Sequence, residues 1–219
     1  MFYNSNNKIM IIEIVLAAII GMALGGGGVI LWKKKSIGKA KLCVLGMKQT
    51  GKTLFFNALR GIYDVQPDET ALTKIGAFKI TLKSSRGKDV VIRLKETLDI
   101  SGSEDYNASY YRDLIFSSTH VIYFCNIYEY LNDEMVRKEV NARLDHIKRF
   151  VDESGKTSEN VFIVLSYGDK VENRKEALRT FIAAINGKPF ASFARRIAVV
   201  NMTKKEDVEE LIKSIFYVK

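Results

Sequence analysis

The chain of 219 residues contains only two cysteines, Cys43 and Cys125. Each lies in an apolar run that predicts a β-strand, and neither has a partner at the spacing of a metal-binding motif. Two such thiols exclude a disulfide framework and indicate buried cysteines in a reducing compartment. The sequence also lacks internal repeats and low-complexity tracts, so we expect one packed domain of ordinary size.

Acidic residues are the scarcer charge type, with 25 Asp and Glu against 34 Lys and Arg and a formal net charge of +9. Up to residue 41 the chain has six lysines and one glutamate, so this short part carries +5 and the rest only +4. No basic stripe interleaved with aromatic residues is present, and we therefore expect no nucleic-acid partner. A basic cluster near the N-terminus instead favours an anionic membrane surface.

The most specific motif spans residues 46–53, which match G-x-x-x-x-G-K-[ST] between an apolar run and a helical pattern. Two glycines allow the backbone to curl around a polyphosphate, and the helix N-terminus adds its dipole. Lys52 is expected to contact the β- and γ-phosphates, and the Thr53 hydroxyl to ligate Mg²⁺. A chance match on a glycine-rich turn is disfavoured by the flanking strand and helix patterns. The expected nucleotide-binding residues here are Gly46, Met47, Lys48, Gln49, Thr50, Gly51, Lys52, Thr53 and Leu54.

From residue 41 onward, apolar runs alternate with helical patterns, which predicts βαβ units and a mostly parallel sheet in an α/β domain. A polar turn at residues 84–88 predicts a hairpin. The expected strands are 42–45, 78–82, 90–94, 121–125, 161–165 and 196–200. The expected helices are 52–59, 133–151, 172–186 and 207–217.

Residues 9–32 are apolar or glycine except for Glu13, and 24 residues at a rise of 1.5 Å are long enough to cross a bilayer. They predict a single transmembrane helix after a short tail, 1–8, and before a basic linker, 33–39. The lysines at 33–35 place the following domain on the cytosolic side. A cleaved signal peptide is the alternative, although it would export a nucleotide-dependent domain to a compartment without nucleotide.

Two features of this apolar segment leave alternatives open. Glu13 lies about one turn inside the predicted membrane span, where it either reaches the interface or pairs with a functional partner. Ala17, Gly21 and Gly25 form a small-xxx-small face that would allow self-association, but the glycines at 25–28 also fit a break in the helix.

Residues 99–102 match D-x-x-G after the second strand that follows the phosphate loop. Asp99 is expected to hold Mg²⁺ through a water, and the Gly102 N–H to contact the γ-phosphate. Thr70, 17 residues after Thr53, is expected to complete the metal shell, with Thr73 as its alternative. An ordinary turn at D-x-x-G and a solvent-facing threonine are the competing interpretations.

Base selection is assigned to two further loops. Asp169, in the sequence S-Y-G-D, can accept the N1–H and the amino group of guanine, a pair of donors that adenine lacks. Ser166 and Tyr167 would support the base, the tyrosine by stacking. Alternatively, Asp169 caps the following helix and selects nothing. The loop formed by Asn201, Met202 and Thr203 would contact the guanine carbonyl through its backbone.

With these motifs in order, residues 40–219 resemble the small GTPases of the Ras superfamily. Within it, the N-terminal anchor and G-K-T-L-F-F at 51–56 are similar to the Arf-like beta subunit of the signal recognition particle receptor. T-K-I-G-A-F at 73–78 is similar to Arf proteins. The resemblance implies a P-loop NTPase fold of Rossmann-like type, with a six-stranded sheet, helices on both faces, and GTP or GDP with Mg²⁺ between switch loops at Thr70 and Gly102.

The sequence departs from that family after D-x-x-G, where Ser103 replaces the glutamine that orients the attacking water. We therefore expect slow intrinsic hydrolysis, with Lys52, Thr70, Gly102 and Ser103 as the candidate catalytic residues. The resulting hypothesis is a membrane-anchored GTP switch in protein targeting or membrane traffic, whose switch loops a protein partner recognises. A permanently GTP-loaded receptor module and a P-loop ATPase or nucleotide kinase remain alternatives, and the identity of the membrane stays open.

Overall fold

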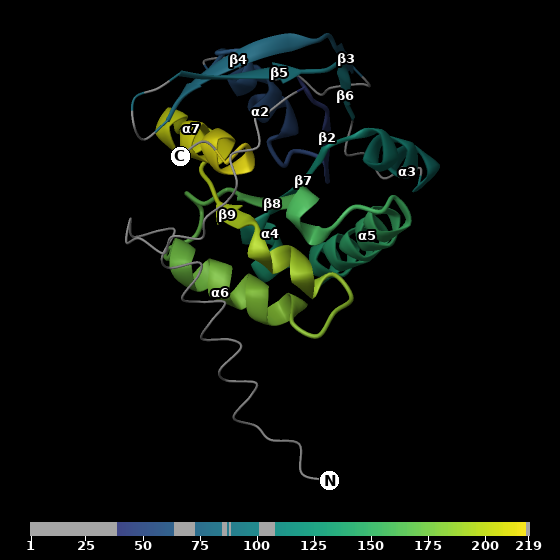
Figure 1. The fold of residues 1–219 in the computed structure, drawn as a ribbon. Helices are drawn as coiled ribbons and strands as arrows, with labels where there is room; N and C mark the ends of the chain where they lie inside the picture. The colour runs from purple at the N-terminus through teal and green to yellow at the C-terminus, as the bar shows by residue number, and fades with distance from the viewer. Residues whose placement is uncertain (1–38, 64–72, 85–86, 88, 101–107, 218–219) are drawn as a thin grey trace. The chain divides into compact units, whose positions relative to one another are not determined.

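The computed structural model describes residues 39–63, 73–84, 87, 89–100 and 108–217 (Figure 1). The chain divides into two compact units, Met1–Ser36 and Ile37–Lys219, and every described residue belongs to the second. None of the helices in these ranges has the length and apolar character that crossing a membrane requires. The predicted span 9–32, with Glu13, Ala17, Gly21 and Gly25, and the lysines at 33–35 lie outside the described residues.

The strands of the described residues pair into three sheets. Their bounds are β1 Lys39–Ala40, β2 Leu42–Gly46, β3 Thr73–Ile75, β4 Phe78–Lys83, β5 Asp89–Leu94, β6 Thr97–Asp99, β7 His120–Asn126, β8 Val161–Ser166 and β9 Ile197–Val199. The largest sheet has the order β2-β7-β8-β9, and all of its pairs are parallel. The second has the order β1-β5-β4, in which β5 is parallel to β1 and antiparallel to β4. The third pairs β3 with β6 in antiparallel fashion.

The three sheets follow one another closely along the chain, because only one or two residues separate β1 from β2, β3 from β4 and β5 from β6. Only Lys41 separates β1 from β2, and its N–H donates to Thr119 Oγ1 at 2.9 Å, so the chain changes neighbour there. Beyond the end of β5, Lys95 N–H still donates to Ala40 O at 2.7 Å, and Thr97 Oγ1 donates to Leu42 O at 2.6 Å. The α/β class is therefore confirmed. In place of the expected six-stranded sheet, the described strands pair into a parallel sheet, a mixed sheet and an antiparallel pair, which meet at these short connections.

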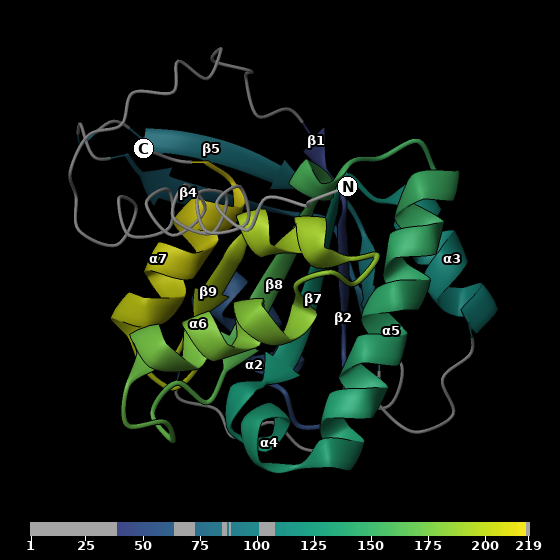
Figure 2. The same ribbon diagram turned by 90° about the horizontal axis from the view of Figure 1, so that it is seen from below.

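In Figure 1 and Figure 2, helices lie on both sides of the β2-β7-β8-β9 sheet. Their bounds are α2 Lys52–Leu59, α3 Ala108–Ser117, α4 Ile127–Asn132, α5 Glu134–Glu153, α6 Arg174–Ile185 and α7 Lys205–Ile215, with 3-10 helices at Ser158–Asn160 and Ala191–Arg195. The four predicted helices are confirmed, with ends that differ by two residues or fewer, whereas α3 and α4 were not predicted. Side-chain caps explain two of the starts, because Asp133 accepts from the first amides of α5 and Asn173 from those of α6.

Strand β2 is buried on both faces, which explains its uninterrupted apolar sequence. Leu42 and Val44 belong to the core that includes α2 and α7. Cys43 and Leu45 belong to the core that includes α5 and α6. Both cysteines of the chain are buried free thiols, as predicted, and burial raises their pKa well above the ordinary value. The end of β2 therefore lies fixed between two packed layers, and the motif at 46–53 begins there.

Candidate functional site

Residues 46–51 form a tight loop that carries the chain from β2 into α2. Gly46 has φ 144°, and a Cβ on it would lie 2.4 Å from Phe124 O on the neighbouring strand. Gly51 has φ 92°, and a Cβ there would lie 3.0 Å from Met202 Cγ. Both conformations favour glycine. Gly51 is also the N-cap residue of α2, and no side chain in the described part caps this helix. The start of such a helix is a place where backbone amides can bind an anion.

Lys52 folds back over its own loop. Its Nζ donates to Gly46 O at 3.1 Å and to Met47 O at 2.5 Å, and the side chain is buried. Thr50 Oγ1 donates to the same Met47 carbonyl at 2.8 Å. Burial lowers the pKa of Lys52, the Asp99 carboxylate raises it and the Arg143 charge lowers it, and the net result is a pKa of about 8. The buried amine of Lys52 is thus held inside the loop by carbonyl oxygens, and pairing with an anion would stabilise its charged form.

Thr53 and Asp99, two of the candidate metal ligands, meet at the start of α2. Thr53 Oγ1 donates to Asp99 Oδ2 at 3.0 Å, although the residues are 46 positions apart in the chain. Asp99 is the last residue of β6 and is buried. Burial raises the pKa of its carboxyl, while the hydrogen bond from Thr53 and the charge of Lys52 lower it. Hydroxyl and carboxylate oxygens are the donors that Mg²⁺ prefers, so this pair fits the ion.

The remaining parts of the predicted switch loops are described only in part. Thr73 lies in β3, directly opposite Asp99 in the antiparallel pair with β6, and is exposed. Thr70, Gly102 and Ser103 lie outside the described residues. Within the described residues, no three His, Cys, Asp or Glu side chains form a metal-binding cluster. Among the described residues near this helix start, Asp99 and the Thr53 hydroxyl are thus the oxygen donors that the sequence assigned to a metal.

The loop after β8 contacts the loop at 46–51. Tyr167 has φ 60°, and its hydroxyl donates to Gln49 O at 2.8 Å. Ser166 is buried and donates through Oγ to Cys125 O at 3.1 Å, which ties the ends of β7 and β8 together. Asp169 is exposed beyond them. The side chain that caps α6 is Asn173, so Asp169 is not the helix cap that the alternative interpretation required.

The loop after β9 closes the same region from the other side. Asn201 Oδ1 accepts from Thr203 N at 2.9 Å and from Thr203 Oγ1 at 2.8 Å, which makes the loop a compact turn. Met202 is buried against Gly51. The structure therefore brings together three predicted segments from distant parts of the chain: 46–53, 166–169 and 201–203.

Two buttressing contacts were not predicted from the sequence. Arg174 Nε donates to Gly168 O at 2.9 Å, and its Nη1 donates to Asp207 Oδ2 at 2.5 Å. The same Asp207 oxygen accepts from Asn201 N at 3.1 Å. Arg174 begins α6 and Asp207 lies in the first turn of α7, so one ion pair holds the loops after β8 and β9 at a fixed separation.

The second unpredicted contact connects the first residue of the motif at 46–53 to helices α3 and α5. The backbone of Gly46 hydrogen-bonds the hydroxyl of Tyr111 on α3. Arg143 on α5 is buried and donates to that hydroxyl at 3.2 Å through Nη1, while its Nε and Nη2 donate to Glu139. This chain joins the first residue of the loop to α3, the first helix after residues 101–107. No local spacing in the sequence marks it.

Comparison of the chain with protein-family models and with curated protein sequences gave no significant match. The chemical assignment of this region therefore depends on its residues and their geometry.

Proposed function

We propose that residues 40–219 form a P-loop GTPase domain that binds GTP or GDP together with Mg²⁺. The observation that carries the proposal is the hydrogen bond between Thr53 and Asp99 beside the buried amine of Lys52. A phosphate counter-charge and two oxygen ligands for Mg²⁺ converge at the start of one helix. Each belongs to a motif that assigns it that role.

The phosphate end of the site follows from the loop geometry. Amides at the start of α2 and the amine of Lys52 would bind the β- and γ-phosphates, and the phosphate oxygens would replace the Gly46 and Met47 carbonyls as partners of the amine. The Thr53 hydroxyl and the Asp99 carboxylate would hold Mg²⁺, with Thr70 as the expected third ligand. Bound there, Mg²⁺ neutralises charge between the β- and γ-phosphates.

The base end of the site follows from the two loops that meet the phosphate loop. Asp169 is exposed and is not the cap of α6, so its carboxylate is free to accept from the guanine N1–H and amino group. Tyr167 already spans from this loop to Gln49 through its hydroxyl. It would border the base, while the backbone of Asn201, Met202 and Thr203 would face the guanine carbonyl.

The strand order also supports a small-GTPase fold. Taken through the interruptions at Lys41 and at residues 95–96, the pairing runs β4-β5-β1 and then β2-β7-β8-β9, with the third pair, β3 and β6, continuing β4 and β5. The candidate loops follow β2, β6, β8 and β9. Parallel strands place such loops at the carboxyl edge, where nucleotides bind in α/β proteins.

We further propose that this domain is a membrane-anchored switch, cytosolic in location, in which Thr70 and Gly102 contact the γ-phosphate and a protein partner recognises the ordered loops. The 24-residue apolar segment and the lysines at 33–35 support the anchor. Its role would lie in protein targeting or membrane traffic.

One sequence feature favours a second candidate, a permanently GTP-loaded receptor module. Ser103 is too short to orient the attacking water from the place of a glutamine. If the switch proposal is correct, Ser103→Gln raises single-turnover GTP hydrolysis above that of the unmutated chain. If neither form turns over, even with a membrane extract added, the module is the better description.

The direct test of nucleotide binding uses two substitutions with matched controls. Lys52→Ala removes the phosphate counter-charge, and Thr53→Asn removes the metal-binding hydroxyl; each should weaken binding of a fluorescent GTP analogue at least 100-fold in the presence of Mg²⁺, roughly the 3 kcal/mol of two charge-assisted hydrogen bonds. Thr53→Ser retains the hydroxyl and should restore most of the affinity. Lys175→Ala, an exposed cation on α6, should bind like the unmutated chain. Unchanged affinity in both loop variants would refute the proposal.

A further inference from the structure

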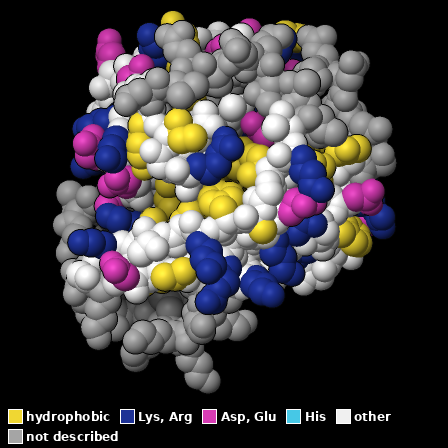
Figure 3. All heavy atoms as spheres, turned by 90° about the horizontal axis from the view of Figure 1, so that it is seen from above, with side chains coloured by type: hydrophobic (Ala, Val, Ile, Leu, Met, Phe, Trp, Pro, Cys, Tyr) yellow, Lys and Arg dark blue, Asp and Glu magenta, His cyan; other side chains and the backbone are white. Residues whose placement is uncertain are grey.

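The outward face of the β1-β5-β4 sheet carries a row of three cations. Strand register places Lys39 of β1 directly opposite Arg93 of β5, and Arg93 directly opposite Lys79 of β4. All three side chains are exposed, whereas Ala40, Ile80 and Leu94 on the other face are buried. Figure 3 shows this face, with Lys and Arg side chains gathered around a few apolar ones. We call Lys39, Arg93 and Lys79 the cationic row.

Nothing in the described part of the chain neutralises the cationic row. No ion pair among the described residues includes Lys39, Arg93 or Lys79, although the nearby Lys74 is paired with Glu96 at 2.9 Å. The next cation along β4, Lys83, is opposite Asp89 in the register. Like charges directly opposite each other in a sheet are destabilising. The row therefore has a cost in the isolated domain that an anionic partner would remove.

The shape and chemistry of this face favour a planar anionic surface. Between the cationic row and the Lys83–Asp89 pair lie Thr81 and the exposed Val91, so small and apolar side chains separate the charges. No aromatic side chain is exposed on these three strands for stacking on bases, which argues against a single-stranded nucleic acid. Lysine and arginine beside an anionic bilayer contribute about a fivefold gain in binding each.

The position of β1 in the sequence, shortly after the apolar segment, also favours an anionic membrane surface as the partner. Only residues 33–38 separate Trp32, the end of the apolar segment, from Lys39. Six residues span at most about 22 Å when fully extended, and three of them are lysines. We propose that the cationic row docks on the anionic lipid surface of the membrane in which the chain is anchored, so that the β1-β5-β4 face is the membrane-facing side of the domain. This inference rests on the proposed anchor and is independent of the nucleotide.

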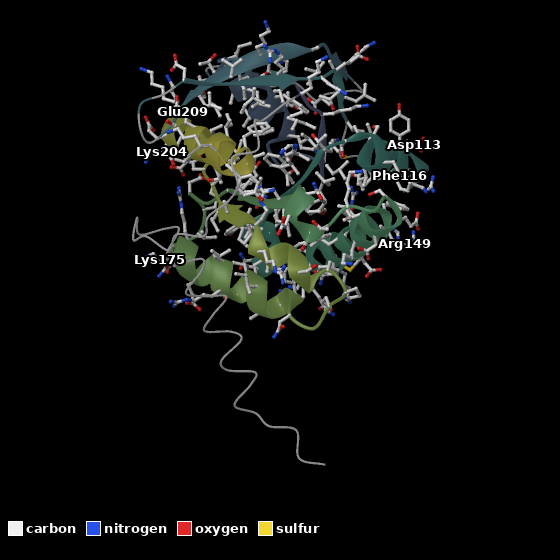
Figure 4. All side chains as sticks on the ribbon, in the orientation of Figure 1. Asp113, Phe116, Arg149, Lys175, Lys204 and Glu209 are labelled. Carbon is white, nitrogen blue, oxygen red and sulfur yellow. The ribbon has the colours of Figure 1, made fainter. Side chains whose placement is uncertain are left out.

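The test measures how close this face comes to lipid in the full chain. Thr81→Cys places a fluorophore beside the cationic row, since both native cysteines are buried. Energy transfer to an acceptor on lipid headgroups is then compared between vesicles of phosphatidylcholine alone and vesicles with one third phosphatidylserine. A second label at Lys175→Cys, on α6, reports from the side of the domain away from β4 and β5 (Figure 4). Flotation of the full chain with the neutral vesicles tests the anchor separately.

Phosphatidylserine should raise energy transfer from position 81 at least twofold over that from position 175. Lys79→Glu with Arg93→Glu, or high salt, should abolish the increase. The control Lys138→Glu with Arg179→Glu changes the net charge equally on α5 and α6 and should retain the increase. Both doubly substituted chains should still float and bind nucleotide as the unmutated chain does. Equal transfer from both vesicles in a chain that floats would overturn the docking face and favour an acidic protein as its partner. Greater transfer from position 175 would also overturn it.

Discussion

The protonation state of the Lys52 amine should affect how tightly the candidate site binds a nucleotide. Burial lowers its pKa to about 8, so the amine is largely charged at pH 7 and largely neutral at pH 9. Phosphate binding requires the charged form, and we therefore expect GTP affinity to fall as the pH rises above 8, by up to about tenfold per unit. Calorimetry in two buffers should show that binding takes up protons, and that the uptake is larger at pH 8.5 than at pH 7.

The matched control is Lys52→Arg, whose guanidinium stays ionised throughout this range. Its binding should be weaker but almost independent of pH between 7 and 9. A pH dependence equal to that of the unmutated chain would mean that another group titrates.

Asp169 provides the residue-scale test of base preference. Asp169→Asn places an amide donor where guanine also has donors, so we expect GTP affinity to fall at least tenfold and xanthosine triphosphate to become the preferred ligand. Competition against a fluorescent analogue measures the order. Asn173→Ala is the control: it removes the α6 cap, should cost about 1 kcal/mol of stability, and should leave base preference unchanged. Loss of preference in both variants would implicate the helix instead of the carboxylate.

At the scale of elements, the turn from β2 into the loop at 46–51 has the least tolerance for change. A Cβ at Gly46 would lie 2.4 Å from Phe124 O, a backbone atom of the adjacent buried strand, at a φ of 144°. Gly46→Ala should therefore destabilise the domain by about 2–5 kcal/mol through overlap and backbone strain. Denaturant unfolding measures this loss.

Gly76 is the matched control, because a Cβ there meets nothing within 4 Å and its φ is not in the positive range. Gly76→Ala should change stability by no more than about 0.5 kcal/mol. Equal effects of the two substitutions would show that Gly46 is not under the predicted constraint.

The elements that the sequence predicted are those whose pattern is local. Strands β7 and β8 are buried on both sides and form continuous apolar runs, and α5 has a long amphipathic repeat with an Asp133 cap. Helix α4 was missed because it has six residues and begins directly after β7. Helix α3 was missed because its sequence mixes apolar and polar side chains, and its burial depends on contacts with α5 such as Tyr111 with Arg143.

In the candidate site, too, residues that form a local sequence motif were predicted and contacts between distant residues were not. Residues 46–53 are contiguous, so their motif was visible in the sequence, and D-x-x-G added Asp99. The bracing of the base loops by Arg174 and Asp207 joins residues 33 positions apart across two helix starts, and no spacing rule marks such a pair. The switch residues Thr70, Gly102 and Ser103 remain predictions from the sequence.

At the scale of the whole molecule, the two packed cores fix three loop segments, 46–53, 166–169 and 201–203, on one framework. Leu42 and Val44 anchor β2 in one core, and Cys43 and Leu45 anchor it in the other. The end of β2 therefore cannot shift without disturbing both layers. Its loop meets Tyr167 and Met202 from segments more than 100 residues away in the chain. A preorganised site of this kind loses little entropy when a ligand binds.

We propose above all that this framework binds a guanine nucleotide through its phosphates and Mg²⁺. The most direct measurement is competition of GTP and ATP for the full unmutated chain, with a fluorescent GTP analogue as the probe and with Mg²⁺ present or chelated. We predict that GTP displaces the probe at a concentration at least 100-fold below that of ATP, since a bidentate carboxylate contact to the base is worth about 3 kcal/mol. We also predict that chelation of Mg²⁺ weakens GTP binding. Displacement by ATP at an equal or lower concentration, or failure of the probe to bind, would contradict guanine-nucleotide binding by this chain.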